Sequence, residues 1–119
     1  MTEKNTGFTR LFKAFYYSYK GIVAAFRHEA AFRQELLLAL VLIPVVYWFP
    51  VSKLERLAMV GVVVLVLVVE LLNSAIEAVV DRVGYEKHEL AGRAKDMGSA
   101  AVLISLMLWV YVWASILFF

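Results

Sequence analysis

The sequence predicts an all-α membrane protein, with an N-terminal amphipathic surface helix and three transmembrane helices in one domain over residues 1–119. The chain is 63% hydrophobic, and so small a protein has no interior large enough to bury that much apolar surface. Three apolar stretches are long enough to cross a hydrocarbon core, which takes roughly 20 helical residues. An open strand would leave backbone groups unpaired in lipid, so these stretches are expected to be helices.

The surface helix is predicted at about residues 7–28. Aromatic and aliphatic residues recur there at steps of three and four, and basic residues, among them Arg10 and Lys20, fall on another side. Such a helix can pack on protein or lie in a membrane surface, and its many aromatic residues favour the membrane surface.

The spans are predicted at about 32–52, 54–80 and 97–119. Pro44 is expected to kink the first of them. Lys and Arg are frequent before the first span and between the second and third. Only two, Lys53 and Arg56, stand at or just after the link between the first and second. The positive-inside rule therefore predicts a cytoplasmic N terminus and a C terminus on the outside.

The second span carries a polar stripe on one helix face, at Glu70, Asn73, Ser74, Glu77 and Asp81. Counted from an outer-surface position at residue 56 at 1.5 Å per residue, Glu70 lies about 21 Å inward and Glu77 about 31 Å. Asn73 and Ser74 suit hydrogen bonds between helices as well as a site. Carboxylates inside a membrane usually serve an ion, a proton or a substrate.

Two further features suggest phosphate chemistry. Glu29 precedes the first span at the cytoplasmic level of Glu77, so the two carboxylates could share a hard cation such as Mg²⁺. Lys95 stands near two glycines at the start of the third span, where an anion could bind. The sequence has neither a P-loop motif nor a G-x-G-x-x-G motif, so any nucleotide site must have another design. The absence of cysteine excludes thiolate catalysis and Cys-ligated zinc.

Four segments together resemble the bacterial integral-membrane diacylglycerol kinases: TGFTR, EAAFRQE, ELLNSAIEAVVDRVG and HELAGRAKDMGSAAV. The resemblance implies a homotrimer with active sites shared between neighbouring subunits. It also implies transfer of the γ-phosphoryl group of ATP to diacylglycerol, with Mg²⁺, in the cytoplasmic (inner) membrane of a bacterium. No nucleic-acid partner is expected.

The resemblance also implies roles for individual residues. Glu70 matches the general base, and Glu29 and Glu77 match ligands of the metal and ATP. Asn73, from its place on the polar stripe, is expected to be a structural or positioning residue. Further ATP contacts are implied for Arg10, Tyr17, Glu86, Lys87, His88, Lys95 and Asp96. Lipid contacts are implied for Arg10, Ala14, Tyr19, Ala31, Glu35, Trp48, Arg56, Glu70, Ser99 and Trp113. The chain departs from the common family pattern at Tyr19, Lys87 and Ala91.

Other functions compete with this one. An undecaprenol kinase of the same family would share the glutamate motif and differ in its lipid substrate. A small oligomeric ion or proton transporter would need a polar path that continues to the outer face, and residues 57–69 are apolar apart from Gly61. A scaffold protein would leave the intramembrane carboxylates without a role.

Overall fold

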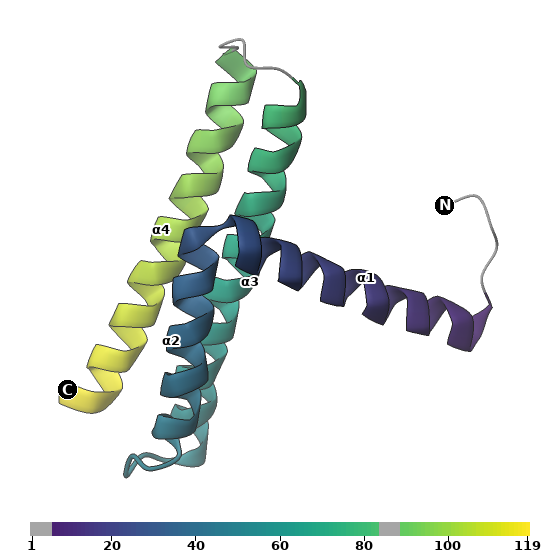
Figure 1. The fold of residues 1–119 in the computed structure, drawn as a ribbon. Coiled ribbons are helices and arrows are strands. Elements are labelled where there is room, and N and C mark those ends of the chain that lie inside the picture. The colour runs from purple at the N-terminus through teal and green to yellow at the C-terminus, as the bar shows by residue number, and fades with distance from the viewer. Residues whose placement is uncertain (1–5, 84–88) are drawn as a thin grey trace.

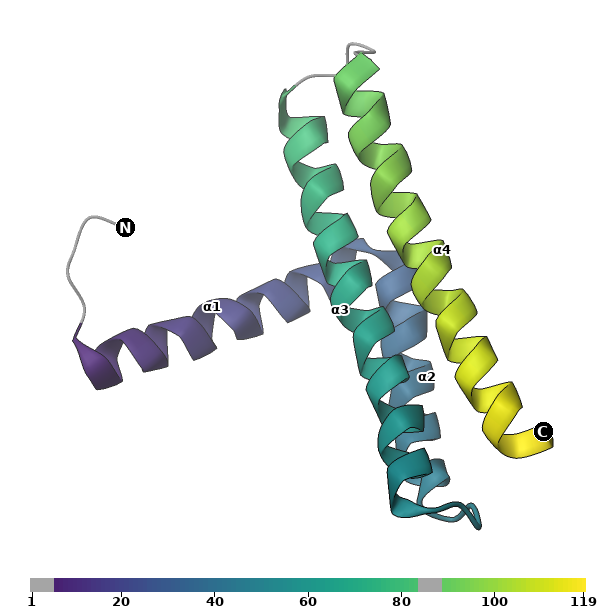
Figure 2. The ribbon, with the colours of Figure 1, turned by 180° about the vertical axis from the view of Figure 1, so that it is seen from behind.

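The computed structural model describes residues 6–83 and 89–119, and in these ranges the chain forms four α-helices and no strand. The helices are α1 (Gly7–His28), α2 (Ala30–Val46), α3 (Lys53–Val83) and α4 (Glu89–Phe118). The all-α fold class is therefore confirmed. α3 packs against both α2 and α4, and α1 leaves this bundle sideways (Figures 1 and 2).

The corner between α1 and α2 consists of one extended residue, Glu29, with φ −118° and ψ 105°. Its backbone N–H donates to the carbonyl of Ala25 at 2.8 Å, and its carbonyl accepts from the N–H of Arg33 at 3.1 Å. The Arg33 guanidinium donates to the carbonyl of Phe26 at 2.8 Å, in the last turn of α1. A cation at a helix C-terminus satisfies unpaired carbonyls and complements the helix dipole, so Arg33 stabilises this corner.

α2 ends at Val46, before the predicted end of the first span at residue 52. The N–H groups of Tyr47, Trp48 and Phe49 donate to carbonyls three residues earlier, at 2.9 to 3.1 Å, which closes the helix with tight turns. Pro50 follows, and the residue before a proline is disfavoured in helical conformation. Pro44 lies inside α2, close to the end of the helix.

α3 begins with a capping box that its sequence specifies. The Ser52 hydroxyl accepts the N–H of Glu55 at 3.1 Å, and the Glu55 carboxylate accepts the N–H of Ser52 at 2.9 Å. α3 has 31 residues and α4 has 30, and both are long and apolar enough to cross a membrane. At 1.5 Å per residue each is about 45 Å long, which exceeds a hydrocarbon core of about 30 Å. Both helices accordingly extend beyond the spans predicted from hydropathy.

Few apolar side chains are buried in the bundle, among them Phe32, Val46, Met59, Val63 and Val66. Large apolar side chains of α2, α3 and α4, such as Leu40, Leu65 and Val110, are exposed instead. A water-soluble monomer rarely leaves so much apolar surface exposed. The bundle is therefore built for an apolar surrounding of lipid or of other helices.

Replacing Trp113 by phenylalanine is expected to lower the free energy of unfolding by about 1 kcal/mol, a typical value for one lost hydrogen bond. The Trp113 indole N–H donates to the carbonyl of Met59 at 3.1 Å and so links α4 to α3. Phenylalanine keeps an aromatic ring beside Phe49 and Trp109 but cannot donate. Unfolding in mixed micelles with increasing sodium dodecyl sulfate measures the change. Trp109→Phe is the control, because it leaves the bond to Met59 in place, and equal stability of wild type and Trp113→Phe would contradict the expectation.

Candidate active site

The polar stripe predicted on the second span is present on α3, and its deepest members are buried. Glu70 is 6% exposed, and Asn73 and Ser74 are each 8% exposed. Glu77 is half-buried and Asp81 is exposed. Steps of three and four residues keep all five on one side of the helix. The stripe therefore leads from a buried carboxylate to an exposed one along a single helix face.

Glu29 belongs to the same site although it comes from the corner between α1 and α2. Its extended backbone ends one helix before the next begins, and its carboxylate makes no capping hydrogen bond to either helix. Glu29 and Glu77 are both near enough to Glu70 to interact with it electrostatically. The structure thus brings together the three carboxylates that carry the predicted chemistry.

Glu35 is a fourth member of this group, for which only a lipid contact was predicted. It lies on α2, interacts electrostatically with Glu70, and has one buried carboxylate oxygen, Oε2, with no hydrogen-bond partner. The sequence does contain a signal for it. Glu35 follows Glu29 by six residues, about 9 Å along a helix, and Glu70 lies about 10 Å deeper than Glu77, so Glu35 is expected near the depth of Glu70. An unpaired buried carboxylate oxygen is costly unless a ligand uses it.

A cavity of about 580 Å³ opens between α1 and α3 beside this group. Glu29 and His28 line it from the end of α1, and Ser74 lines it from the stripe on α3. Its other walls are small or apolar residues such as Gly21, Ala25 and others on both helices. A cavity with few polar groups and mostly apolar walls suits a ligand that is mostly hydrocarbon.

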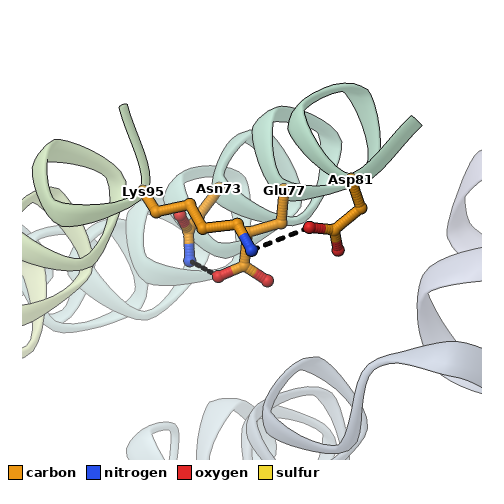
Figure 3. A network of polar contacts seen from close by, with 4 residues as sticks. All are labelled: Asn73, Glu77, Asp81 and Lys95. Atoms are coloured by element: carbon orange, nitrogen blue, oxygen red, sulfur yellow. Dashed lines mark hydrogen bonds and ion pairs between the residues drawn. The ribbon is translucent and has the colours of Figure 1, made fainter. Parts of the chain in front are cut away.

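Lys95 reaches the stripe from α4, across the gap between two helices. Its ammonium Nζ lies 2.7 Å from Oδ1 of Asp81, and the Asn73 amide Nδ2 donates to Oε1 of Glu77 at 3.4 Å (Figure 3). Asp81 and Lys95 lie outside the predicted spans, and the hydrogen bond to Asp81, followed by its charge, raises the pKa of Lys95. Lys95 is therefore a fixed cation at neutral pH, placed beside two carboxylates.

Gly98 of α4 packs directly against the side chain of Asn73 on α3. A Cβ at Gly98 would collide with the Asn73 side chain, at Oδ1 and Cγ. Asn73 Oδ1 is buried without a hydrogen-bond partner. Glycine at 98 therefore gives the Asn73 amide room to lie against α4 while its Nδ2 faces Glu77.

The carboxylate oxygens at this site are the kind of ligand that Mg²⁺ prefers. Among residues 6–83 and 89–119, no three His, Cys, Asp or Glu side chains lie close enough to hold a metal ion by themselves. Mg²⁺ is usually bound by one or two carboxylates together with phosphate oxygens and water, so two glutamates suffice for a metal that arrives with ATP. Glu29 and Glu77 fit that role.

Several predicted contacts lie away from this group in one chain. α1 carries Arg10, Ala14, Tyr17 and Tyr19 ahead of its last two turns, and this helix extends away from the bundle in both views (Figures 1 and 2). The turn with Trp48, the start of α3 with Arg56, and the end of α4 with Trp113 lie at the opposite end of the bundle from Lys95. Ala31, Asp96 and Ser99 are exposed near the group of carboxylates and Lys95. The predicted contacts at Glu86, Lys87 and His88 fall outside the described residues.

Comparisons with known proteins agree with the resemblance. Residues 16–117 match the family described as "Prokaryotic diacylglycerol kinase". A "Diacylglycerol kinase" of Escherichia coli (strain K12) is 53% identical over 117 residues, which are 98% of this chain and 96% of that protein. A "Diacylglycerol kinase" of Pseudomonas aeruginosa is 55% identical over 112 residues, or 94% and 91% of the two chains. One from Haemophilus influenzae is 51% identical over 98% of each chain. With its carboxylate stripe and Lys95 in place, this chain belongs to the prokaryotic diacylglycerol kinase family.

Proposed function

We propose that this chain is a lipid kinase of the bacterial membrane, which transfers the γ-phosphoryl group of ATP to the primary hydroxyl of 1,2-diacylglycerol and forms phosphatidic acid. The observation that carries the proposal is the row of Glu70, Glu77 and Lys95, which leads from a buried carboxylate to an accessible ammonium. Family membership supports the same activity. The row suits a reaction in which one substrate is dissolved in lipid and the other in water.

The bundle crosses the bacterial cytoplasmic membrane with α2, α3 and α4, and α1 lies on the cytoplasmic surface. α2 has 17 residues and a length of about 26 Å, close to the hydrocarbon thickness. The ends of α3 and α4 that carry Asp81 and Lys95 extend past the level at which α1 joins the bundle, as Figure 1 shows. This arrangement and the positive-inside rule support an N terminus in the cytoplasm and a C terminus outside.

Phosphoryl transfer depends mainly on positioning and on neutralising charge, with little covalent work for the protein. Glu70 accepts a hydrogen bond from the lipid hydroxyl and takes its proton as the hydroxyl oxygen attacks the γ-phosphorus of ATP. The bond from the γ-phosphorus to the bridging oxygen breaks, and ADP leaves. Lys95 offers its ammonium to the phosphate oxygens. Glu77 lies between these two groups and, through Asn73, is held on the face of α3 that points to Lys95.

Glu29 and Glu77 would hold the Mg²⁺ that accompanies ATP. Bound there, the metal neutralises the charge that develops on the phosphate oxygens. The Glu29 carboxylate is suited to this role because it makes no capping hydrogen bond and lines a cavity.

The active protein is a homotrimer whose sites are shared between subunits. In one chain Arg10 and Tyr17 lie on α1, which leaves the bundle sideways (Figure 1). A neighbouring copy that packs on the exposed faces of α3 and α4 would supply its own α1 to the site. Those faces carry the apolar side chains, such as Leu72, Ile76 and Met97, that such packing would cover.

The purified protein, in vesicles or mixed micelles, is expected to phosphorylate diacylglycerol from MgATP and to phosphorylate undecaprenol about tenfold or more slowly, a factor that corresponds to about 1.4 kcal/mol. Both carry a primary hydroxyl, but the diacylglycerol glycerol backbone has ester groups that polar residues near the interface can recognise. Radiolabelled ATP and thin-layer separation of the lipid products measure both rates side by side. Vesicles without either lipid are the control.

Two outcomes would contradict the proposal. Faster labelling of undecaprenol would replace diacylglycerol by the polyprenol as the substrate. Labelling of neither lipid, with the protein folded, would contradict the kinase assignment.

A further inference from the structure

We propose that Asp81 is a positioning residue of this site, which holds the Lys95 ammonium away from Glu77 and so keeps Glu77 available for the MgATP substrate. The inference deepens the proposed kinase function and rests on it. Asp81 and Lys95 form an ion pair of 2.7 Å between α3 and α4, and Glu77 lies one helical turn before Asp81 (Figure 3). Nothing in the resemblance gave Asp81 a role.

The geometry places one ammonium within reach of two carboxylates. Lys95 interacts electrostatically with Glu77 in addition to its hydrogen bond with Asp81. A lysine side chain is long and flexible, and its ammonium has three donors that turn to whichever carboxylate is offered. Without the Asp81 carboxylate, the remaining anionic partner on this face of α3 is Glu77.

The Glu77 carboxylate binds Mg²⁺ less well when the Lys95 ammonium occupies its oxygens. Mg²⁺ needs carboxylate oxygens at short and nearly ideal positions, and an ammonium on the same oxygens competes with it. Asn73 already donates to Oε1 of Glu77. Asp81 therefore keeps the Glu77 carboxylate free of a second donor, and it keeps Lys95 extended across the gap between the helices.

The ion pair also ties together the two helices that flank residues 84–88. Asp81 lies in the last turn of α3, and Lys95 lies in the second turn of α4. The side chains are 60% and 45% exposed, so phosphate from water can reach the ammonium without first opening a core. The ammonium has three donors, so it can contact a phosphate oxygen of ATP while it stays paired with Asp81.

Replacing Asp81 by asparagine is expected to raise the KM for MgATP about three- to fivefold and to leave kcat within about twofold, as expected for an accessible ion pair. The Kd of a fluorescent, non-hydrolysable ATP analogue, measured without lipid substrate, should rise by the same factor. Asp81→Glu keeps the charge and should restore both values. A rise in KM with an almost unchanged kcat indicates a positioning role, because a loss of folded protein would lower the apparent kcat instead.

The matched control is Glu89→Gln, which removes one negative charge from an exposed ion pair on α4, with Arg93 at 3.7 Å. It changes the net charge by the same amount and leaves Lys95 and Asp81 paired, so KM and Kd should stay at the wild-type values. Far-UV circular dichroism and the elution volume in detergent verify that each variant is folded.

Each other outcome overturns the inference. Unchanged KM and Kd in Asp81→Asn would mean that Lys95 is positioned without Asp81. A lower KM would mean that Asp81 competes with phosphate, and a fall in kcat alone would place Asp81 in the chemical step. Failure of the proposed function is seen separately, because wild-type protein would then label no lipid, whereas the analogue would still report the effect of Asp81 on nucleotide binding.

Discussion

Replacing Glu70 by glutamine is expected to lower the rate of diacylglycerol phosphorylation by about 10²- to 10⁴-fold, the usual contribution of a general base. Glutamine has nearly the same shape as glutamate, so it fills the same buried position on α3. It cannot take a proton from the lipid hydroxyl. Binding of a non-hydrolysable ATP analogue should be almost unchanged, because Glu29, Glu77 and Lys95 are intact. Initial rates with radiolabelled ATP measure the loss.

Glu55→Gln is the matched control for this substitution. Glu55 lies on the same helix, at its other end, where its carboxylate accepts the N–H of Ser52. Glutamine also serves at this position of a capping box, so the start of α3 should stay formed and the rate should stay at the wild-type value. If Glu70→Gln kept a rate within about tenfold of wild type, the proton would be leaving by another route and Glu70 would not be the base.

The sequence predicted the helices because each carries a strong local signal. The aromatic periodicity at 7–28 becomes α1, Gly7–His28, and the long apolar runs become the central parts of α3 and α4. Hydropathy could not predict how far α3 and α4 continue, because it measures preference for lipid and not for helix. Residues 89–96 carry four charged side chains, yet they are helical. Pro44 was expected to kink the first span, and α2 ends two residues after it, at Val46, ahead of Pro50.

The site could be predicted where it lies on one helix and not where it joins two. The spacing of Glu70, Asn73 and Glu77 on α3 follows from helical periodicity alone. The meeting of Asp81 with Lys95 depends on how α4 is rotated and shifted against α3. A hydropathy pattern does not determine that register, because both helices are apolar on most sides. Glu35 joins the carboxylates for the same reason, through the packing of α2 on α3.

Replacing Gly98 by alanine is expected to reduce the kinase rate about tenfold or more and to lower the free energy of unfolding by about 1 to 3 kcal/mol, the usual cost of overpacking. The new methyl group would collide with Oδ1 and Cγ of Asn73. Either the Asn73 amide turns away and loses Glu77, or α4 moves outward and carries Lys95 with it. Both responses disturb the groups that bind phosphate and metal. Rates with radiolabelled ATP and unfolding in mixed micelles measure the two effects.

Gly92→Ala separates this steric effect from the ordinary effect of alanine on a helix. Gly92 lies on the same helix, and a Cβ there would meet no atom within 4 Å. Alanine is favoured over glycine in a helix interior by about 0.5 to 1 kcal/mol, so this control should be slightly more stable than wild type and equally active. Opposite changes in stability at the two glycines would therefore locate the tight contact of α3 with α4 at Gly98. If both variants were stable and active, α4 could not pack against Asn73 as closely as the structure has it, and Glu77 would need another group to hold it in place.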